Sequence, residues 1–175
     1  MAAKSFLRLV AGKWQQIRGV VISAGASNAG DIVALDDSGR LDSSVMPVGI
    51  GANTQSIPAS EALSAGNFVN FYSNAGVLNV RKADNSNGRR ADGFVLAAVA
   101  SGATATVYPM DSVNSALSGL TPATEYFLGT AGGVVATPLD ETLTANQGVG
   151  KISQLLGTSK SATELVTNDC DPVIL

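Results

Sequence analysis

Residues 66–83 read GNFVNFYSNAGVLNVRKA, and this stretch indicates the fold class. Residues 68–71 alternate between two sets of side chains, and the alternation resumes at 77–83. A period of two is typical of a strand whose two faces meet different surroundings. Between them, SNAG at 73–76 places Asn and Gly where a tight turn needs a positive φ. The stretch therefore predicts a β-hairpin.

The same pattern recurs towards the C-terminus. Turn residues separate three further pairs of apolar, alternating segments: 93–100 with 104–109, 124–129 with 133–138, and 150–157 with 162–168. Further strands are expected at 13–22 and 31–35. Short strands at spacings of about 8–12 residues are typical of sandwiches and barrels. We predict an all-β fold, a small β-barrel or sandwich built of hairpins, with an extended N-terminal arm.

Few segments fall outside this pattern. SEALSAG (60–66) and DETLTANQ (140–147) each have the composition of one or two helical turns, but neither has a sustained apolar stripe. The polar stretch ADNSNGRRADG (83–93) predicts a long exposed loop between strands, with a surface-contact role as the alternative.

Composition changes divide the chain into three segments. Residues 1–52 form an N-terminal arm and hairpin segment, residues 53–110 a β module, and residues 111–175 a C-terminal β-hairpin module. The link at 111–124 has no hydrophobic run and resembles a connection. Whether the two modules form one barrel or two stays open.

The composition favours assembly. The 175 residues are 45% hydrophobic but only 14% charged, against roughly 25% charged in ordinary soluble domains. A weakly charged surface rich in small residues suits burial against other copies or a larger structure. The alternative is a small β protein with an unremarkable surface.

Charge is unevenly placed along the chain. Residues 1–30 carry four basic residues and no acid, whereas the remainder carries 7 basic and 14 acidic residues. A basic arm on an acidic body indicates contact with an acidic partner. The candidate partner or intersubunit contact residues are Arg8, Lys13, Trp14 and Arg18. Trp14 is equally well interpreted as an ordinary core tryptophan.

Much chemistry is excluded by residue types that are missing or few. The chain has no histidine, so a Ser–His–Asp or Cys–His site lacks its base. Its single cysteine, Cys170, excludes an intrachain disulfide and cysteine-based zinc sites. GASNAGDI (25–32) has phosphate-loop spacing but carries Asp31 where a lysine belongs. Neither an enzyme nor a cofactor is expected. A mitochondrial presequence is a weak alternative for the N-terminus, and no apolar run is long enough to span a membrane.

Four aspartates lie between Asp31 and Asp42. No register places oxygen ligands at alternating positions, as a calcium loop requires, because apolar or basic residues intervene. A hairpin fits better, with a strand at 31–35, a turn at 36–39 and a returning strand at 40–42. An irregular carboxylate-rich metal site in this region stays as an alternative.

From Gly19 onwards the chain resembles a family of small structural proteins of tailed bacteriophages. Their pattern "aG-ivaLd-sGrld-s-mP-GiGadt" falls here on Ala29–Gly30, Ile32–Leu35, Ser38–Asp42, Met46–Pro47 and Gly49–Thr54. Residues 80–108 are similar to the β module of such proteins, and the segments after residue 117 to their C-terminal hairpins.

The resemblance implies a non-enzymatic virion protein, made in the host cytoplasm and located on the capsid surface. It would decorate and stabilise the head by binding the major capsid protein, as a homo-oligomer, with a trimer favoured. A tail or head fibre protein that contacts the host surface is the alternative, and a carbohydrate-active β protein is a weaker third. Neither nucleic acid nor membrane is expected as a partner, since basic and aromatic residues are too few for nucleic-acid binding.

Overall fold

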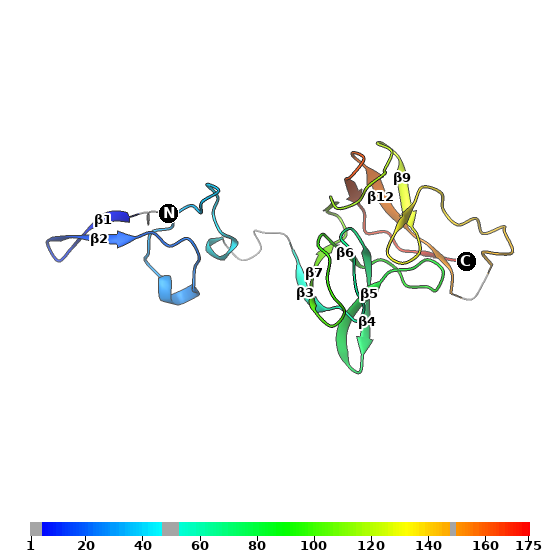
Figure 1. The fold of residues 1–175 in the computed structure, drawn as a ribbon, viewed down its shortest axis with the longest axis horizontal. Coiled ribbons are helices and arrows are strands. Elements are labelled where there is room, and N and C mark those ends of the chain that lie inside the picture. The colour runs from blue at the N-terminus through cyan, green and yellow to red at the C-terminus, as the bar shows by residue number, and fades with distance from the viewer. Residues whose placement is uncertain (1–4, 47–52, 148–149) are drawn as a thin grey trace. The chain divides into compact units, whose positions relative to one another are not determined.

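A computed structural model describes residues 5–46, 53–147 and 150–175 (Figure 1). The fold is all-β, as the sequence predicts, and its sheets are antiparallel. The chain divides into two compact units, Met1–Ala52 and Asn53–Leu175. Pro47 and Gly49–Ala52, which carry part of the phage-like sequence pattern, lie outside the described residues, as does Lys4.

The first unit begins with a hairpin of β1 (Ser5–Val10) and β2 (Lys13–Arg18). Ala11 and Gly12 form its two-residue turn, with φ of 48° and 76°. Two positive φ values match the twist of the flanking strands, which makes such turns the preferred hairpin connection. The N-terminal arm is this hairpin, and its second strand ends four residues before the expected position 22.

Two short 3-10 helices, η1 (Gly25–Asn28) and η2 (Ser43–Val45), follow in the same unit. The strand expected at 31–35 is wrong, because only Val33 pairs, in a single parallel bridge to Val20. The hydrogen bonds of residues 32 and 34 go to Val20, so no partner strand returns at 40–42. The turn at 36–39 is confirmed, since Gly39 has a φ of 76° and its N–H bonds the Asp36 carbonyl.

The second unit contains two five-stranded sheets. The first has the strand order β3-β7-β6-β4-β5, and the second has the order β10-β9-β12-β13-β8. Two short strands, β11 (Ile152–Ser153) and β14 (Val173–Ile174), pair separately. The bounds in the first sheet are β3 (Gln55–Pro58), β4 (Phe68–Asn74), β5 (Val77–Lys82), β6 (Gly93–Val95) and β7 (Thr104–Pro109). Those in the second are β8 (Val113–Asn114), β9 (Glu125–Leu128), β10 (Val134–Val135), β12 (Leu155–Ser159) and β13 (Leu165–Thr167).

All four predicted hairpin pairings are present. Strand β4 pairs with β5, β6 with β7, β9 with β10, and β12 with β13. The β4–β5 turn consists of Ala75 and Gly76, with φ of 50° and 85°, as in the β1–β2 hairpin. Strand β6 ends earlier than expected, at Val95, so its connection to β7 is longer than the sequence indicates.

Two apolar clusters hold the second unit together. One joins Phe68 and Phe94 of the first sheet to Leu128, Leu156 and Leu165 of the second, so the two sheets share a core. The other lies on the opposite face of the first sheet and contains Ile57, Ala59, Leu63, Val69, Val80, Val95, Ala105 and Val107. Of the two predicted architectures, the sandwich describes this arrangement, since no closed barrel forms among the described residues.

Other local predictions need correction. Residues 60–66 form no helix, because Leu63 pairs with Val99 in an antiparallel bridge and enters the core. Residues 140–147 form turns, including one helical-type bond from the Gln147 N–H to the Leu143 carbonyl.

The segment 83–93 is not a simple exposed loop. Asp84 and Arg89 pair with each other, which closes a tight turn. Ala83, Asn85 and Ala91 are buried. The Asn85 side chain donates to the Leu128 carbonyl at 2.8 Å, and the Asn85 backbone carbonyl accepts from the Ile152 N–H at 2.9 Å. The polar residues thus connect this turn to the second sheet.

Candidate functional site

The β1–β2 hairpin has two different faces, which its register defines. Cross-strand partners share a face, and successive residues alternate between faces. We call one the Trp14 face, formed by Ser5, Leu7, Leu9, Trp14, Gln16 and Arg18. We call the other the Arg8 face, formed by Phe6, Arg8, Val10, Lys13, Gln15 and Ile17.

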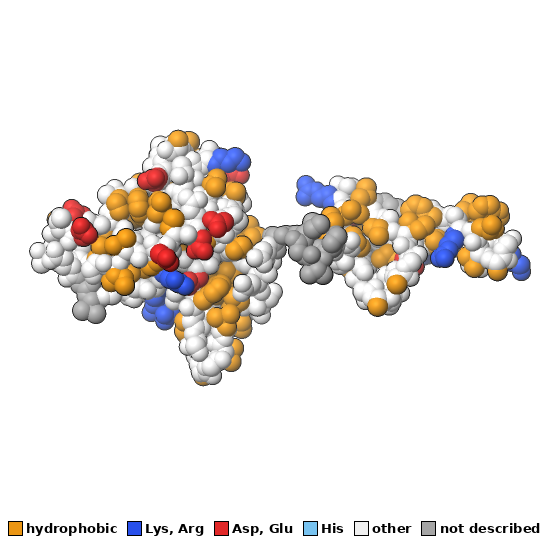
Figure 2. Space-filling model, turned by 180° about the vertical axis from the view of Figure 1, so that it is seen from behind, with side chains coloured by type: hydrophobic (Ala, Val, Ile, Leu, Met, Phe, Trp, Pro, Cys, Tyr) orange, Lys and Arg blue, Asp and Glu red, His pale blue; other side chains and the backbone are white. Residues whose placement is uncertain are grey.

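The Trp14 face exposes large apolar side chains. Trp14 and Leu7 are each 71% exposed, and Leu9, the direct cross-strand partner of Trp14, is 58% exposed. Hydrophobic and basic side chains are visible on this unit in Figure 2. Single exposed apolar residues are common in proteins, but adjacent ones of this size mark interaction surfaces.

The Arg8 face is anchored at the base of the hairpin. A Cβ at Gly19 would lie 2.9 Å from the Phe6 ring and 2.7 Å from the Ala34 Cβ. Glycine therefore allows Phe6 to pack down beside the buried Ala34. This packing holds the Arg8 face of the hairpin base against the rest of the unit. The Trp14 face therefore stays exposed when the unit is folded.

The four residues singled out from sequence all lie on this hairpin, and all are exposed. The structure does not bring them onto one surface: Arg8 and Lys13 lie on one face, and Trp14 and Arg18 on the other. The interpretation of Trp14 as a core residue is wrong, given its exposure. Among the described residues, the ion pairs are Arg90–Asp92 and Lys160–Glu164, and neither involves the hairpin.

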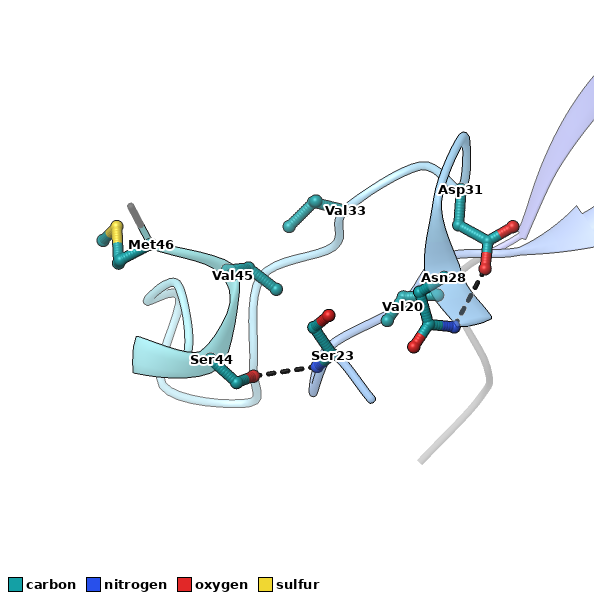
Figure 3. Close-up of a pocket in the computed structure, with 8 residues that line it drawn as sticks. All are labelled: Val20, Ser23, Asn28, Asp31, Val33, Ser44, Val45 and Met46. Carbon is teal, nitrogen blue, oxygen red and sulfur yellow. Dashed lines mark hydrogen bonds between the residues drawn. The ribbon is translucent and has the colours of Figure 1, made fainter. Parts of the chain in front are cut away.

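A hollow of about 360 Å³ lies in the same unit, in the segment that follows the hairpin (Figure 3). We call it the Val33 hollow; it is lined by Val20, Ser23, Asn28, Asp31, Val33, Ser44, Val45 and Met46. The Ser23 N–H donates to the Ser44 Oγ at 2.8 Å, and the Asn28 Nδ2 donates to the Asp31 Oδ2 at 2.9 Å. These bonds join η1 and η2 to nearby residues of the same unit and hold the walls of the hollow in place.

Sequence reasoning did not find this hollow. Its apolar walls come from Val20, Val33 and the Val45–Met46 pair, which are separated along the chain and follow no single period. The parallel bridge brings Val20 beside Val33, and the hydrogen bond from Ser23 to Ser44 holds the η2 segment near them. The sequence shows that this segment contains apolar residues. They can be recognised as the walls of one hollow only once the Val20–Val33 bridge is known.

Two aspartates of this region stabilise its turns by accepting hydrogen bonds from the backbone. The Asp36 Oδ1 accepts from the N–H groups of Ser38 and Arg40, both at 2.8 Å. The Asp42 Oδ1 accepts from the Ser44 N–H at 2.9 Å, and hydrogen bonds from the Ser44 side chain and backbone hold the pKa of the Asp42 carboxyl below its ordinary value. Within the described ranges, no group of three or more acidic, Cys or His residues lies close enough to hold a metal ion.

The second unit contains two smaller hollows of about 290 Å³ each. In one of them, two of the polar side chains are engaged within the fold. Asp92 accepts from the Phe71 N–H and pairs with Arg90, and the buried Gln154 amide bonds both the N–H and the carbonyl of Ala91. Because these two groups stabilise the fold, the exposed hairpin and the Val33 hollow are the better candidates.

No protein-family model and no curated protein matches this chain. Among solved structures, the chain is similar to the N base of the head fibre protein gp8.5 of bacteriophage phi29. The sequence identity is 13%, the TM-score is 0.44, and the match covers 70% of this chain and 92% of that chain. At this identity and TM-score, the similarity leaves the function of this chain open. Among the described residues, no helix has the length and apolar character needed to cross a membrane.

Proposed function

We propose that this chain is a non-enzymatic virion protein of a tailed bacteriophage that decorates and stabilises the capsid. The first unit attaches to the major capsid protein, and the second unit forms the outward body. The protein is made in the host cytoplasm and ends on the capsid surface. The proposal joins the sequence pattern from Gly19 onwards to the surface chemistry of the first unit.

One observation carries the proposal: a two-stranded hairpin that exposes large apolar side chains on its Trp14 face and carries basic residues but no acid. An isolated two-stranded hairpin is marginally stable in water, because it buries little apolar surface. Covering Leu7, Leu9 and Trp14 contributes about 1–2 kcal/mol for each side chain. A hairpin of this kind is therefore expected to gain stability when it is bound.

The Arg8 face supplies the electrostatic part of attachment. Arg8 and Lys13 are exposed, and among the described residues neither has an ion-pair partner. An acidic patch on a capsid subunit complements them and speeds the encounter. Binding across two capsid subunits occurs only on the assembled shell. It therefore stabilises that shell by mass action, without any catalysis.

The test mixes purified protein with undecorated heads of the same phage and measures co-sedimentation at low salt. We expect saturable binding at many copies per head. Arg8→Ser and Lys13→Ser should each weaken binding about three- to tenfold, because each removes one steering charge. Lys160→Ser is the matched control: it removes an exposed lysine from the second unit and should leave binding unchanged.

Deleting residues 1–22 should abolish binding while the second unit stays folded. If the deleted protein binds heads as well as the full chain does, the attachment role of the first unit is wrong. If wild-type protein does not bind heads at all, decoration itself is wrong.

A head or tail fibre is the second candidate. The division into two compact units favours it, since one unit can attach to the virion while the other contacts a host surface. Copy number separates the two functions: a decoration protein is present at many copies on the shell, whereas a fibre is present at few and binds cells. Particle reconstruction by electron microscopy measures both copy number and position.

A further inference from the structure

The Trp14 face and the Val33 hollow both present apolar side chains that could cover one another. One presents a large indole beside two leucines, and the other offers valine and methionine walls. A hollow of about 360 Å³ is at the small end of ligand sites and suits one large side chain. Buried tryptophan is among the commonest anchors of protein interfaces. The two surfaces lie in the same unit, but Trp14 of the same copy is 71% exposed and does not line the hollow.

The charges of the two segments are also complementary. On the Trp14 face, the described hairpin carries Arg18 and no acid. Residues 19–46 carry four aspartates and Arg40, which gives −3. Asp31, at the rim of the hollow, is exposed and accepts from the Asn28 amide. Opposite charges of this kind attract the hairpin of one copy to the hollow segment of another and fix its orientation.

We infer that the Trp14 face of one copy docks into the Val33 hollow of a second copy, with the Trp14 indole in the hollow and the basic hairpin beside the Asp31 rim. This inference goes beyond the proposed function and names an interface for the homo-oligomer that the sequence resemblance implies. Docking leaves the Arg8 face, on the other side of the hairpin, available for an acidic capsid partner.

The contact is heterologous, because the docking face and the receiving hollow are different surfaces. Each added copy leaves one face and one hollow unfilled. A contact of this kind closes into a ring when its rotation completes a full turn and otherwise extends as a filament. The trimer favoured by the sequence resemblance corresponds to the ring. A trimeric ring has three times the monomer mass of 17.7 kDa. Since the interface combines apolar burial with charge, self-association should weaken as salt is raised.

Two variants of the full chain test the inference. Trp14→Ser removes the docking side chain, and Val33→Arg fills the hollow with a long cation. Each variant alone should be monomeric by sedimentation velocity at about 100 μM, a concentration far above a micromolar Kd, at which wild type should form the ring. Mixed in equal amounts, the two variants should form a heterodimer, because one intact hollow remains for one intact Trp14 face.

Further variants guard against misfolding and long-range effects. Val33 takes part in the bridge to Val20, so Asp31→Arg, at the exposed rim, provides a second hollow variant. It should weaken self-association at least tenfold while circular dichroism stays unchanged. Arg8→Ser, on the opposite face, is the matched control in the hairpin and should still form the ring.

Three results would overturn the inference. One is wild-type protein that stays monomeric at the test concentration. Another is a Trp14→Ser variant that still forms the ring. The third is a mixture of two folded, monomeric variants that yields no heterodimer, which would indicate a symmetric contact or a different occupant. None of these measurements uses phage heads, so a ring that fails to bind heads contradicts only the proposed function.

Discussion

Gly157 lies where β12 changes register against β9, and its backbone has a φ of 146°. A Cβ at this position would collide with the Val166 carbonyl oxygen of the neighbouring strand β13. Alanine therefore requires both a strained backbone and a shift of two paired strands. We expect Gly157→Ala to lower the free energy of unfolding of the second unit by about 3 kcal/mol or more, measured by chemical denaturation.

Gly102 provides the control for Gly157. It also has a positive φ, of 82°, but no atom lies within 4 Å of an added Cβ. Gly102→Ala should cost only about 1 kcal/mol, the price of the backbone conformation alone. Equal losses in the two variants would show that the close approach of β12 and β13 is not what requires Gly157.

Asp84 makes the stability of the second unit depend on pH. Burial raises the pKa of its carboxyl. Hydrogen bonds from Ser86 and the Ala131 N–H and the charge of Arg89 outweigh burial, so that the pKa lies below the ordinary value of 3.8. A lowered folded-state pKa adds stability above the unfolded-state pKa, and this contribution is lost as pH falls through the folded-state value.

We therefore expect Asp84→Asn to destabilise the second unit at pH 7, and the difference from wild type to shrink as pH falls below about 4. Denaturant titrations at several pH values measure this difference. Asp171→Asn is the control, because Asp171 is exposed and no hydrogen bond or ion pair among the described residues holds its carboxylate. A difference for Asp84→Asn that is independent of pH would mean that its carboxylate charge is not what stabilises the turn.

At the scale of elements, the hairpins were the most predictable part of the fold. Each depends on local information, namely alternating side chains and turn residues between them, with Gly at a positive φ in the turn of Ala75 and Gly76. The stretch at 31–35 has similar composition but no partner strand, so its residues bond Val20 instead. Local pattern indicates that a segment is extended, but pairing decides whether it becomes a strand.

The two-residue turns also lead to a prediction. Ala75 has a φ of 50°, a conformation that alanine adopts at a cost and asparagine tolerates better. Ala75→Asn should therefore stabilise the second unit by about 0.5–1 kcal/mol, measured by denaturation. Ala11→Asn makes the same change in the β1–β2 turn and should slow hydrogen exchange in that hairpin while leaving the second unit unchanged. A loss of stability in Ala75→Asn would mean that the alanine methyl packs better than the turn geometry indicates.

At the scale of the whole molecule, the two sheets of the second unit depend on each other. Phe68 and Phe94 pack against Leu128 and Leu156 in one cluster, and the fully buried Asn114 donates to the Gly66 carbonyl at 3.0 Å. Sequence could not reveal this shared core, because apolar periodicity says which face of a strand is buried but not against what. The Val33 hollow escaped prediction for the same reason.

This shared core predicts independence from the first unit. A chain of residues 53–175 should fold and show the same unfolding midpoint as the corresponding transition of the full protein, since the clusters that stabilise it lie within these residues. Circular dichroism against temperature measures this at equal protein concentration. A chain split at residue 110 is the control and should not fold, because the split divides the core. A large fall in the midpoint of the 53–175 chain would mean that the first unit supports the second.

The chain carries a single tryptophan, and it lies on the exposed hairpin of the first unit and belongs to neither core cluster of the second. Indole emission therefore reports on one surface only. Unfolding of the sandwich should hardly change this emission, whereas transfer of Trp14 from water to an apolar partner should shift the emission to shorter wavelength. The protein thus contains its own optical probe of binding, with no label to attach and no competing signal to subtract.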